Sequence, residues 1–377
     1  MRTHVLVLGV LALCLTACVV LPPSAKPGWA LTVVRTEDWR GLYGGDVWRY
    51  DIASGRAEPL TEGDALRWRT TQVPANEWQW LRCCAPTVSP DGAWLAYSPH
   101  SGYWSPGGED TPLVNVPPYM IVQPVDGSSP PQTIEGTVRA VWSPDSQRLA
   151  YTVGLNTPWA EAGDPSLYVY DLSSQSATPL LPGDPTMRAL GALVWSPDGR
   201  SLAYVARVQS QDERDGDALE AQRLDLDTGT VEVVAPVKVG IASAPRLCWT
   251  SDGQVVVGRQ PGVTRCSDPA RSEEPGCVWT RCTAPDGTRV AQVTPMAEAE
   301  SSRVTVEGAG GVLWERELAG VVADRVAWSA DGSVLLLTSG AGGTYAEPWR
   351  TWRLPADGSG EVELAIEGQI ISIVPQQ

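Results

Sequence analysis

The chain has 377 residues, of which 44 are acidic and 28 are basic, and its formal net charge at pH 7 is −16. A surface this acidic repels phosphate backbones, so we expect no nucleic-acid partner. The sequence contains only two histidines, no GxSxG elbow and no Walker sequence. Neither a Ser-His-Asp hydrolase nor phosphoryl transfer therefore has a motif to support it.

Residues 1–17 have the pattern of an export signal, in which Arg2 precedes an apolar run over 5–15 and small residues lead to Cys18. The run is too short for a membrane span of the mature protein. The sequence "LTAC" resembles the lipobox of bacterial lipoproteins, which implies cleavage before Cys18 and a diacylglyceryl group on its thiol. Val19, in place of Asp, favours the outer membrane in Gram-negative sorting. We therefore expect an exported, lipid-anchored protein that faces the periplasm or the cell surface, according to the host envelope.

The next segment, 18–28, contains three prolines in "VVLPPSAKPG". Prolines stiffen a chain, and nothing in this segment could form a core, so we expect a tether between the anchor and the folded domain. The remaining residues, 29–377, are expected to form a single domain.

A hairpin motif recurs along this domain, in segments such as "VWSPDSQRLAYT" and "VWSPDGRSLAYV". Its aligned Ser or Thr falls at positions 89, 143, 196, 250 and 329, and the first three steps are nearly equal. In Ser-Pro-Asp-Gly, proline presets φ, aspartate bonds its own backbone, and glycine accepts a positive φ. The motif therefore predicts a tight turn between two strands, in which Ser and Asp serve geometry and not catalysis.

A second hairpin follows most copies, as in "LYVYDLSSQSATPLL". Two hairpins per unit give a four-stranded antiparallel sheet, and a series of such units predicts an all-β fold, a β-propeller of four-stranded blades. Six blades are favoured and seven are the alternative, because the longest step contains an additional hairpin, "RVTVEGAGGVLWEREL". The last strand, "QIISIV", is expected to pair with the first unit and close the ring.

Together, "WSPDG...LAY" and "LYVYDL...ATPLL" resemble the TolB-type, WD40-like propeller repeats that are common in bacterial envelope proteins. The resemblance extends over most of the domain. It implies a fold more than a function, because one fold can host many functions.

Six cysteines lie beyond Cys18, and an even number in an exported chain favours disulfides. No Cys or His spacing suggests a metal site or a redox motif, and no cofactor is expected. The candidate pairs are Cys266 with Cys277 and Cys248 with Cys282, whereas Cys83 and the adjacent Cys84 either bridge to each other or have separate fates.

Long loops are expected to gather on one face of the ring. If strands A to D run outward from the axis, the Ser-Pro-Asp-Gly turn joins A to B, and the long segments fall in the BC and DA connections on the opposite face. These loops carry tryptophans that could stack on sugars or hold a protein partner, or instead pack over the propeller as anchors. They are Trp68, Trp78, Trp80, Trp104 and Trp159.

Three arginines share one position, three residues before the Trp of strand A: Arg139, Arg246 and Arg325. Because strand A lines the axis, they are expected to form a partial ring of positive charge that suits a carboxylate or phosphate ligand. The alternative is that each pairs with a neighbouring acid, such as Asp324.

These features favour a noncatalytic scaffold, an envelope lipoprotein that binds protein or glycan on the face with the BC and DA loops. No catalytic residue and no metal ligand is assigned. The alternative is a carbohydrate-active propeller enzyme, a hydrolase or lyase type, with carboxylates at the mouth of the channel. The expected partners are the membrane, through the lipid anchor, and an envelope protein or glycan.

Overall fold

A computed structural model of the chain contains strands and no helix among the residues that it describes. None of this part of the chain forms a helix long and apolar enough to span a membrane. The structure describes residues 28–37, 42–63, 65–69, 86–98, 100–101, 119–135, 137–153, 166–181, 187–208, 218–237, 246–249, 253–258, 280–296, 300–339 and 349–375.

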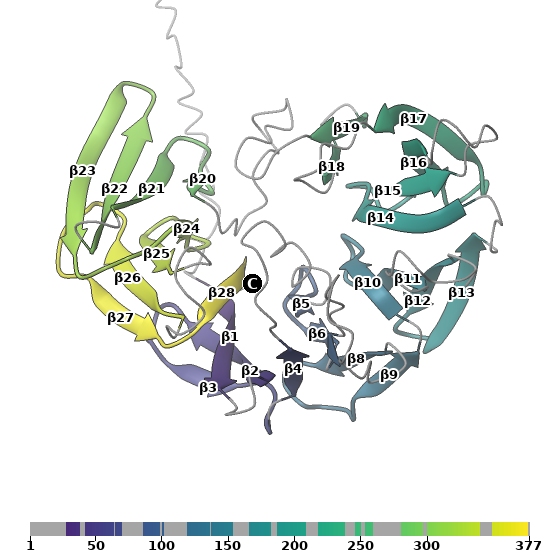
Figure 1. Ribbon diagram of the computed structural model, residues 1–377, viewed down its shortest axis with the longest axis horizontal. Coiled ribbons are helices and arrows are strands. Elements are labelled where there is room, and N and C mark those ends of the chain that lie inside the picture. The colour runs from purple at the N-terminus through teal and green to yellow at the C-terminus, as the bar shows by residue number, and fades with distance from the viewer. Residues whose placement is uncertain are drawn as a thin grey trace, which may run out of the picture.

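Within these residues the strands form seven sheets around a ring (Figure 1). The repeat pattern favours six blades, with seven as the alternative. Sheet 2 contains β5 (Thr87–Val88), β6 (Trp94–Tyr97), β8 (Tyr119–Pro124) and β9 (Gln132–Glu135). Sheet 3 contains β10 (Thr137–Trp142), β11 (Arg148–Val153), β12 (Ser166–Asp171) and β13 (Ser176–Leu181). Sheet 4 contains β14 (Met187–Trp195), β15 (Ser201–Val208), β16 (Ala218–Asp225) and β17 (Val231–Val237).

Sheets 5 to 7 continue the ring. In the described part, sheet 5 consists of β18 (Arg246–Trp249) and β19 (Val255–Gly258). Sheet 6 contains β20 (Arg281–Thr283), β21 (Val290–Met296), β22 (Ser301–Gly308) and β23 (Gly311–Ala319). Sheet 7 contains β24 (Arg325–Trp328), β25 (Val334–Thr338), β26 (Thr351–Pro355) and β27 (Glu363–Ile366). The additional hairpin of the longest repeat step is thus β22 and β23, which complete sheet 6 together with β20 and β21.

Sheet 1 closes the ring, as predicted, with the last strand of the chain. β28 (Gln369–Val374) pairs with β1 (Trp29–Glu37), and Trp29 lies opposite Val374. β1 continues to β2 (Leu42–Asp51), on which β3 (Ala57–Pro59) and β4 (Leu66–Arg69) both pair, and β7 (His100–Ser101) lies parallel to β4. The predicted all-β propeller of four-stranded antiparallel blades is confirmed, since five sheets show this pattern fully.

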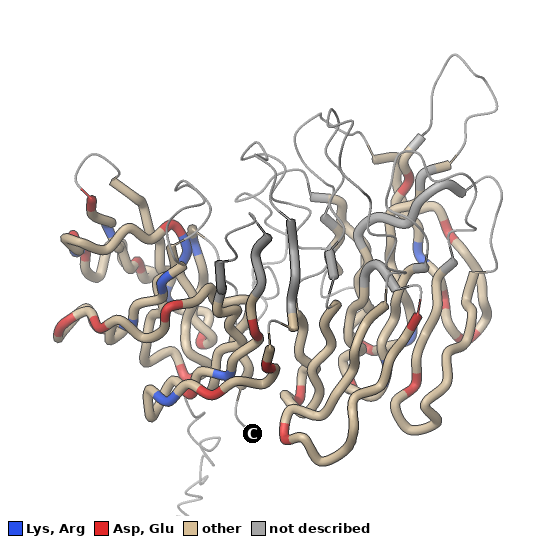
Figure 2. The backbone as a smooth tube through the Cα atoms, turned by 60° about the horizontal axis from the view of Figure 1, so that its bottom comes forward, with Lys and Arg blue, Asp and Glu red and all other residues tan. Residues whose placement is uncertain are grey.

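The ring has two ends, and tight turns between the described strands lie along its lower edge in Figure 2. In sheets 2 to 7 the first strand lies nearest the centre, and in sheet 1 β28 takes this place. Neighbouring first strands contact each other, as β10 does with β14 and β20 with β24. Antiparallel pairing places the turns that join the first strand to the second, and the third to the fourth, at one end, which we call the turn face. The opposite end, where the first strands begin, is called the loop face.

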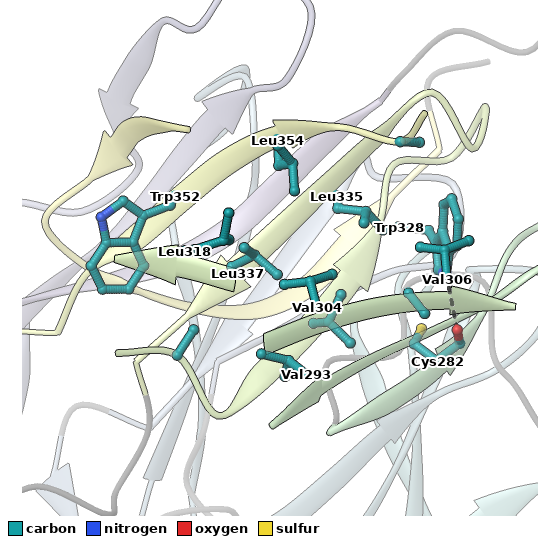
Figure 3. Close-up of a cluster of buried hydrophobic side chains, with 14 of the residues drawn as sticks. Cys282, Val293, Val304, Val306, Leu318, Trp328, Leu335, Leu337, Trp352 and Leu354 are labelled. Carbon is teal, nitrogen blue, oxygen red and sulfur yellow. Dashed lines mark hydrogen bonds between the residues drawn. The ribbon is translucent and has the colours of Figure 1, made fainter. Parts of the chain in front are cut away.

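Apolar side chains fill the spaces between neighbouring sheets. The cluster between sheets 6 and 7 is typical: alternate residues of facing strands interlock, and the Trp328 indole lies among them with 1% exposure (Figure 3). Its Nε1 donates a hydrogen bond to the Cys282 carbonyl at 2.9 Å. The Trp before the turn motif therefore joins adjacent sheets.

Candidate functional site

The repeated Ser-Pro-Asp-Gly segments form turns whose polar groups bond to one another. In sheet 4, Ser196 Oγ donates to Asp198 at 2.6 Å, and the Ser201 N–H donates to Ser196 Oγ at 2.8 Å. Gly199 completes the turn with a φ of 70°. The bond from the Ser196 hydroxyl lowers the pKa of Asp198 and keeps it ionised as an acceptor. The same Ser-to-Asp bond recurs at Ser89, Ser143 and Ser329.

Two arginines on the turn face clamp neighbouring sheets together. The Arg289 guanidinium lies 4.8 Å from the ring centroid of Trp328 in the next sheet. It also donates to Asp286 at 2.9 Å and to the Gly332 carbonyl at 3.0 Å. These contacts occupy the cation, so we assign these arginine clamps to stability. The other clamp is Arg148, which makes the same contacts with Trp195, Asp145 and the Gly199 carbonyl.

Arg325 lies at the other end of the ring, where β24 begins on the loop face. Its side chain is 25% exposed, and its Nε atom lies 4.0 Å from Oδ1 of Asp324. The Arg325 side chain makes no hydrogen bond to the described residues, although a guanidinium has five N–H donors. Burial lowers the pKa of Arg325, and the Asp324 carboxylate opposes that shift. The side chain is thus a largely buried cation whose donors are not used by the described residues.

Hydrogen bonds fix the backbone around this arginine. The Asp324 N–H donates to the Thr338 carbonyl at 3.1 Å. The Thr338 and Thr351 hydroxyls lie 3.1 Å apart, and Thr351 Oγ1 donates to the Gly368 carbonyl at 2.8 Å. These contacts link sheet 7 to the residue before β28 of sheet 1. We call these five residues the Arg325 corner; its fixed backbone gives the guanidinium the support that a preorganised binding group needs.

The chemistry of the Arg325 corner suits an anion. A planar guanidinium matches a carboxylate through two parallel N–H···O bonds. The separation from Asp324 is too long for a hydrogen bond, so a ligand carboxylate would not have to displace one. Asp324 adds a carboxylate that can accept a proton beside the bound anion. In the described part of the chain, no group of three or more His, Cys, Asp or Glu side chains is placed to hold a metal ion.

Of the three predicted arginines, only Arg325 has a described side chain. The backbone places Arg139 in β10 and Arg246 at the start of β18, and both are first strands, as β24 is for Arg325. Their side chains lie outside the described residues, so the partial ring stays a prediction. The alternative pairing with Asp324 is present at Arg325 as a long ion pair.

Among the described residues, none of the predicted tryptophans or cysteines lies at the Arg325 corner. Trp68 and Cys248 belong to β4 and β18, but the structure describes only their backbone. Cys282 is buried against Trp328, and the disulfide pairing stays a prediction. The predicted residues outside the described ranges are Cys18, Trp78, Trp80, Cys83, Cys84, Trp104, Trp159, Cys266 and Cys277.

Sequence reasoning missed the arginine clamps. The signal was present, because Arg148 and Arg289 both lie five residues after the first residue of the turn motif. Their role depends on the next sheet, whose Trp and Gly carbonyl they contact, and a single repeat does not show which side chain crosses to its neighbour.

The chain was compared with family models, curated proteins and solved structures. No family model matches the chain. It is 34% identical over 105 residues to the "Probable dipeptidyl-peptidase 5" of Emericella nidulans, and 33% identical over 111 residues to that of Aspergillus terreus. These matches cover 25% and 26% of this chain, and the chain spans only 13% and 14% of those relatives.

Three solved structures align with most of the chain at low sequence identity. One is an oligogalacturonate lyase from Vibrio parahaemolyticus, with 12% identity, 89% of this chain and 84% of that chain covered, and a TM-score of 0.45. Prolyl oligopeptidase B from Galerina marginata has 12% identity, coverage of 92% and 52%, and a TM-score of 0.44. Dipeptidyl peptidase 4 from Porphyromonas gingivalis has 14% identity, coverage of 88% and 50%, and a TM-score of 0.38.

These findings contradict two predictions, that the chain is a noncatalytic scaffold and that it is more likely not an enzyme than an enzyme. The curated relatives that match in sequence are peptidases by name. The noncatalytic prediction depended on missing local motifs. A site built from the ends of several strands leaves no such motif, because its members are far apart in sequence and meet only in the fold.

Proposed function

We propose that the chain is a carbohydrate-active enzyme of the lyase type, which cleaves a carboxylate-bearing glycan at the loop face. The observation that carries this proposal is the Arg325 guanidinium, which is largely buried and makes no hydrogen bond among the described residues. A uronate unit of a glycan supplies the carboxylate that such a group binds through two parallel hydrogen bonds.

Arg325 would also promote the reaction. Pairing with the uronate carboxylate stabilises the negative charge that spreads onto it as the neighbouring C–H bond ionises. A base takes that proton, the electron pair of the C–H bond forms a C=C bond, and the glycosidic oxygen on the next carbon leaves and is protonated. Asp324, whose Oδ1 lies 4.0 Å from Arg325 Nε, is the base that we propose.

An assay with uronate oligosaccharides and their neutral counterparts tests this proposal. We expect the ultraviolet absorbance of an unsaturated uronate to rise with the acidic substrates only. Arg325→Gln should lower kcat/KM at least about 100-fold, as loss of one preorganised charge-stabilising group does. The matched control is Arg303→Gln, which removes an exposed ion pair with Glu315 on the outer strands and should leave kcat/KM unchanged. No turnover of any uronate would overturn the proposal.

The sequence match to dipeptidyl-peptidases supports a second candidate, the release of dipeptides from a peptide. A Ser-His-Asp mechanism within this chain would have to use His100, the only histidine after the export signal. Chromogenic dipeptidyl amides test this candidate. Turnover of these amides, together with no turnover of uronates, would replace the lyase proposal.

The repeat's resemblance to TolB-type envelope proteins and the "LTAC" sequence support an envelope location for this enzyme. In this proposal residues 1–17 are removed, Cys18 is lipidated, and residues 18–28 tether the domain of residues 29–377 to the membrane, where an envelope glycan is the substrate. Labelling with a radioactive fatty acid should mark the wild-type protein and not Cys18→Ser. Equal labelling of the two proteins would exclude Cys18 as the anchor.

A further inference from the structure

The described chain begins in the middle of the turn face. Trp29, the first residue of β1, lies opposite Val374, the last residue of β28. The Gly28 carbonyl accepts a hydrogen bond of 3.2 Å from the Ile52 N–H, at the turn between β2 and β3. A Cβ built on Gly28 would lie 2.4 Å from the Val374 carbonyl oxygen and 3.3 Å from Ala330 Cβ in the first turn of sheet 7. Contacts with two turns and with the end of β28 therefore fix the point where residue 28 joins the domain.

The turn face is also strongly acidic. Most of its turns contain an aspartate that accepts hydrogen bonds from residues of the same turn. The aspartate side chains are exposed or partly exposed to solvent. Acidic positions lie along the lower edge of the ring in Figure 2, where β28 ends. The aspartates of the first turns are Asp91, Asp145, Asp198, Asp286 and Asp331, and those of the second turns are Asp51, Asp126, Asp171, Asp225 and Asp357.

Most of these carboxylates have a pKa below the ordinary value. Hydrogen bonds from the Ser173 hydroxyl and the Ser174 N–H lower the pKa of Asp171 to about 2. Bonds from Ser359 lower the pKa of Asp357 in the same way. The turn face therefore keeps its negative charge at neutral pH, and an anionic surface nearby would be repelled.

We propose that the turn face is turned toward the lipid bilayer that holds Cys18, and that its carboxylates keep a hydrated gap between them. This inference rests on the proposed lipid anchor. Nine residues lie between Cys18 and Gly28, and the ten steps from one to the other reach at most ~35 Å when fully extended. β1 has nine residues, which makes the ring roughly 30 Å deep from face to face. The loop face, with the Arg325 corner, is thereby presented to substrate on the side away from the membrane.

Energy transfer to the membrane surface tests this orientation. The full-length lipidated protein is reconstituted in vesicles of phosphatidylethanolamine and phosphatidylglycerol that carry an acceptor dye on a lipid headgroup. A fluorescent amino acid replaces either Asp357, exposed on the turn face, or Glu367, exposed between β27 and β28 on the loop face. Because the faces are roughly 30 Å apart, transfer from position 357 should exceed transfer from position 367 at least about twofold.

The outcomes separate the orientation from the anchor. Equal transfer from both positions, or greater transfer from position 367, would overturn the orientation and leave the anchor standing. Transfer from neither position would overturn the anchor itself, and cleavage of uronates is measured independently on the same samples. A larger share of phosphatidylglycerol should lower transfer from position 357, and added salt should restore it, because salt screens charge repulsion. An increase with phosphatidylglycerol would contradict the hydrated gap.

Discussion

Arg289 on the turn face and Arg325 on the loop face have similar surroundings and different contacts. Their side chains are 27% and 25% exposed, and each lies beside an aspartate. Arg289 is 2.9 Å from Asp286, donates to a carbonyl of the next sheet and covers a Trp ring. The Arg325 side chain has one ion pair of 4.0 Å and no hydrogen bond to the described residues. Burial and charge are therefore shared by both arginines, and the use of the N–H donors by the described residues separates the structural arginine from the one that we propose binds a ligand.

The largest expected effect concerns the Trp that the Arg289 clamp covers. Trp328 is 1% exposed between sheets 6 and 7, and Trp328→Ala should lower the free energy of unfolding by about 3–5 kcal/mol. Urea denaturation measures this loss. Leu364→Ala, at a side chain that is 52% exposed on β27, is the control and should change stability by less than about 0.5 kcal/mol. A loss below about 1 kcal/mol for Trp328→Ala would show that the two sheets are not joined there.

Replacing the two arginines tests the comparison directly. Arg289→Met keeps much of the apolar stem but removes charged hydrogen bonds and the cation–π contact, so it should cost about 2 kcal/mol of stability. Among the described residues, Arg325→Met removes only a long ion pair and should cost less than about 1 kcal/mol. Urea denaturation measures both variants, and uronate cleavage should show the opposite order of losses. Equal losses of stability would remove the distinction between the two arginines.

Two glycines sharpen the role of the clamp further. Gly287 and Gly332 both have a φ of 69°, but a Cβ on Gly287 meets nothing within 4 Å, whereas one on Gly332 lies 2.8 Å from Arg289 Nη2. Gly287→Ala should cost about 1 kcal/mol from backbone strain alone. Gly332→Ala should cost more, and a double-mutant cycle with Arg289→Met should remove the excess. An excess that persists without the guanidinium would contradict this account.

The sequence predicted the fold because its information is local and repeated. Ser196, Asp198 and Gly199 specify a turn within four residues, and the same turn recurs at nearly constant steps. The pairing of β28 with β1 followed from the need to cover sheet edges. The number of sheets was harder to predict, because β20 to β23 lack the Trp and the Ser of the motif and carry Thr283 and Ala284 instead.

The candidate site was predicted only in part. The position of Arg325 in its strand is periodic and could be found from the sequence. The length of its contact with Asp324, and the absence of a side-chain hydrogen bond to the described residues, depend on packing between sheets. Arg289, which forms a clamp, also has a fixed position in the repeat, so the sequence did not distinguish its role from that of Arg325. The sequence identifies the chemical type of each side chain. Its hydrogen-bond partners depend on segments that meet only in the fold, as Arg289 and the Gly332 carbonyl do.

The smallest expected effect concerns acid sensitivity of the turn face. The folded pKa of Asp171 is about 2, below its ordinary value of 3.8, because Ser173 and Ser174 donate to the ionised carboxylate. A lowered folded pKa stabilises the protein above the unfolded pKa, and this contribution is lost as the pH falls from about 4 to about 2. Asp171→Asn should therefore lower the melting temperature slightly at about pH 7, and the gap from wild type should close near pH 2. Thermal unfolding across this range measures the gap, which is expected to be small because the carboxylate is largely solvated. A gap that widened in acid would show that the Asp171 carboxylate is destabilising in the folded turn and that its hydrogen bonds do not offset the repulsion on this face.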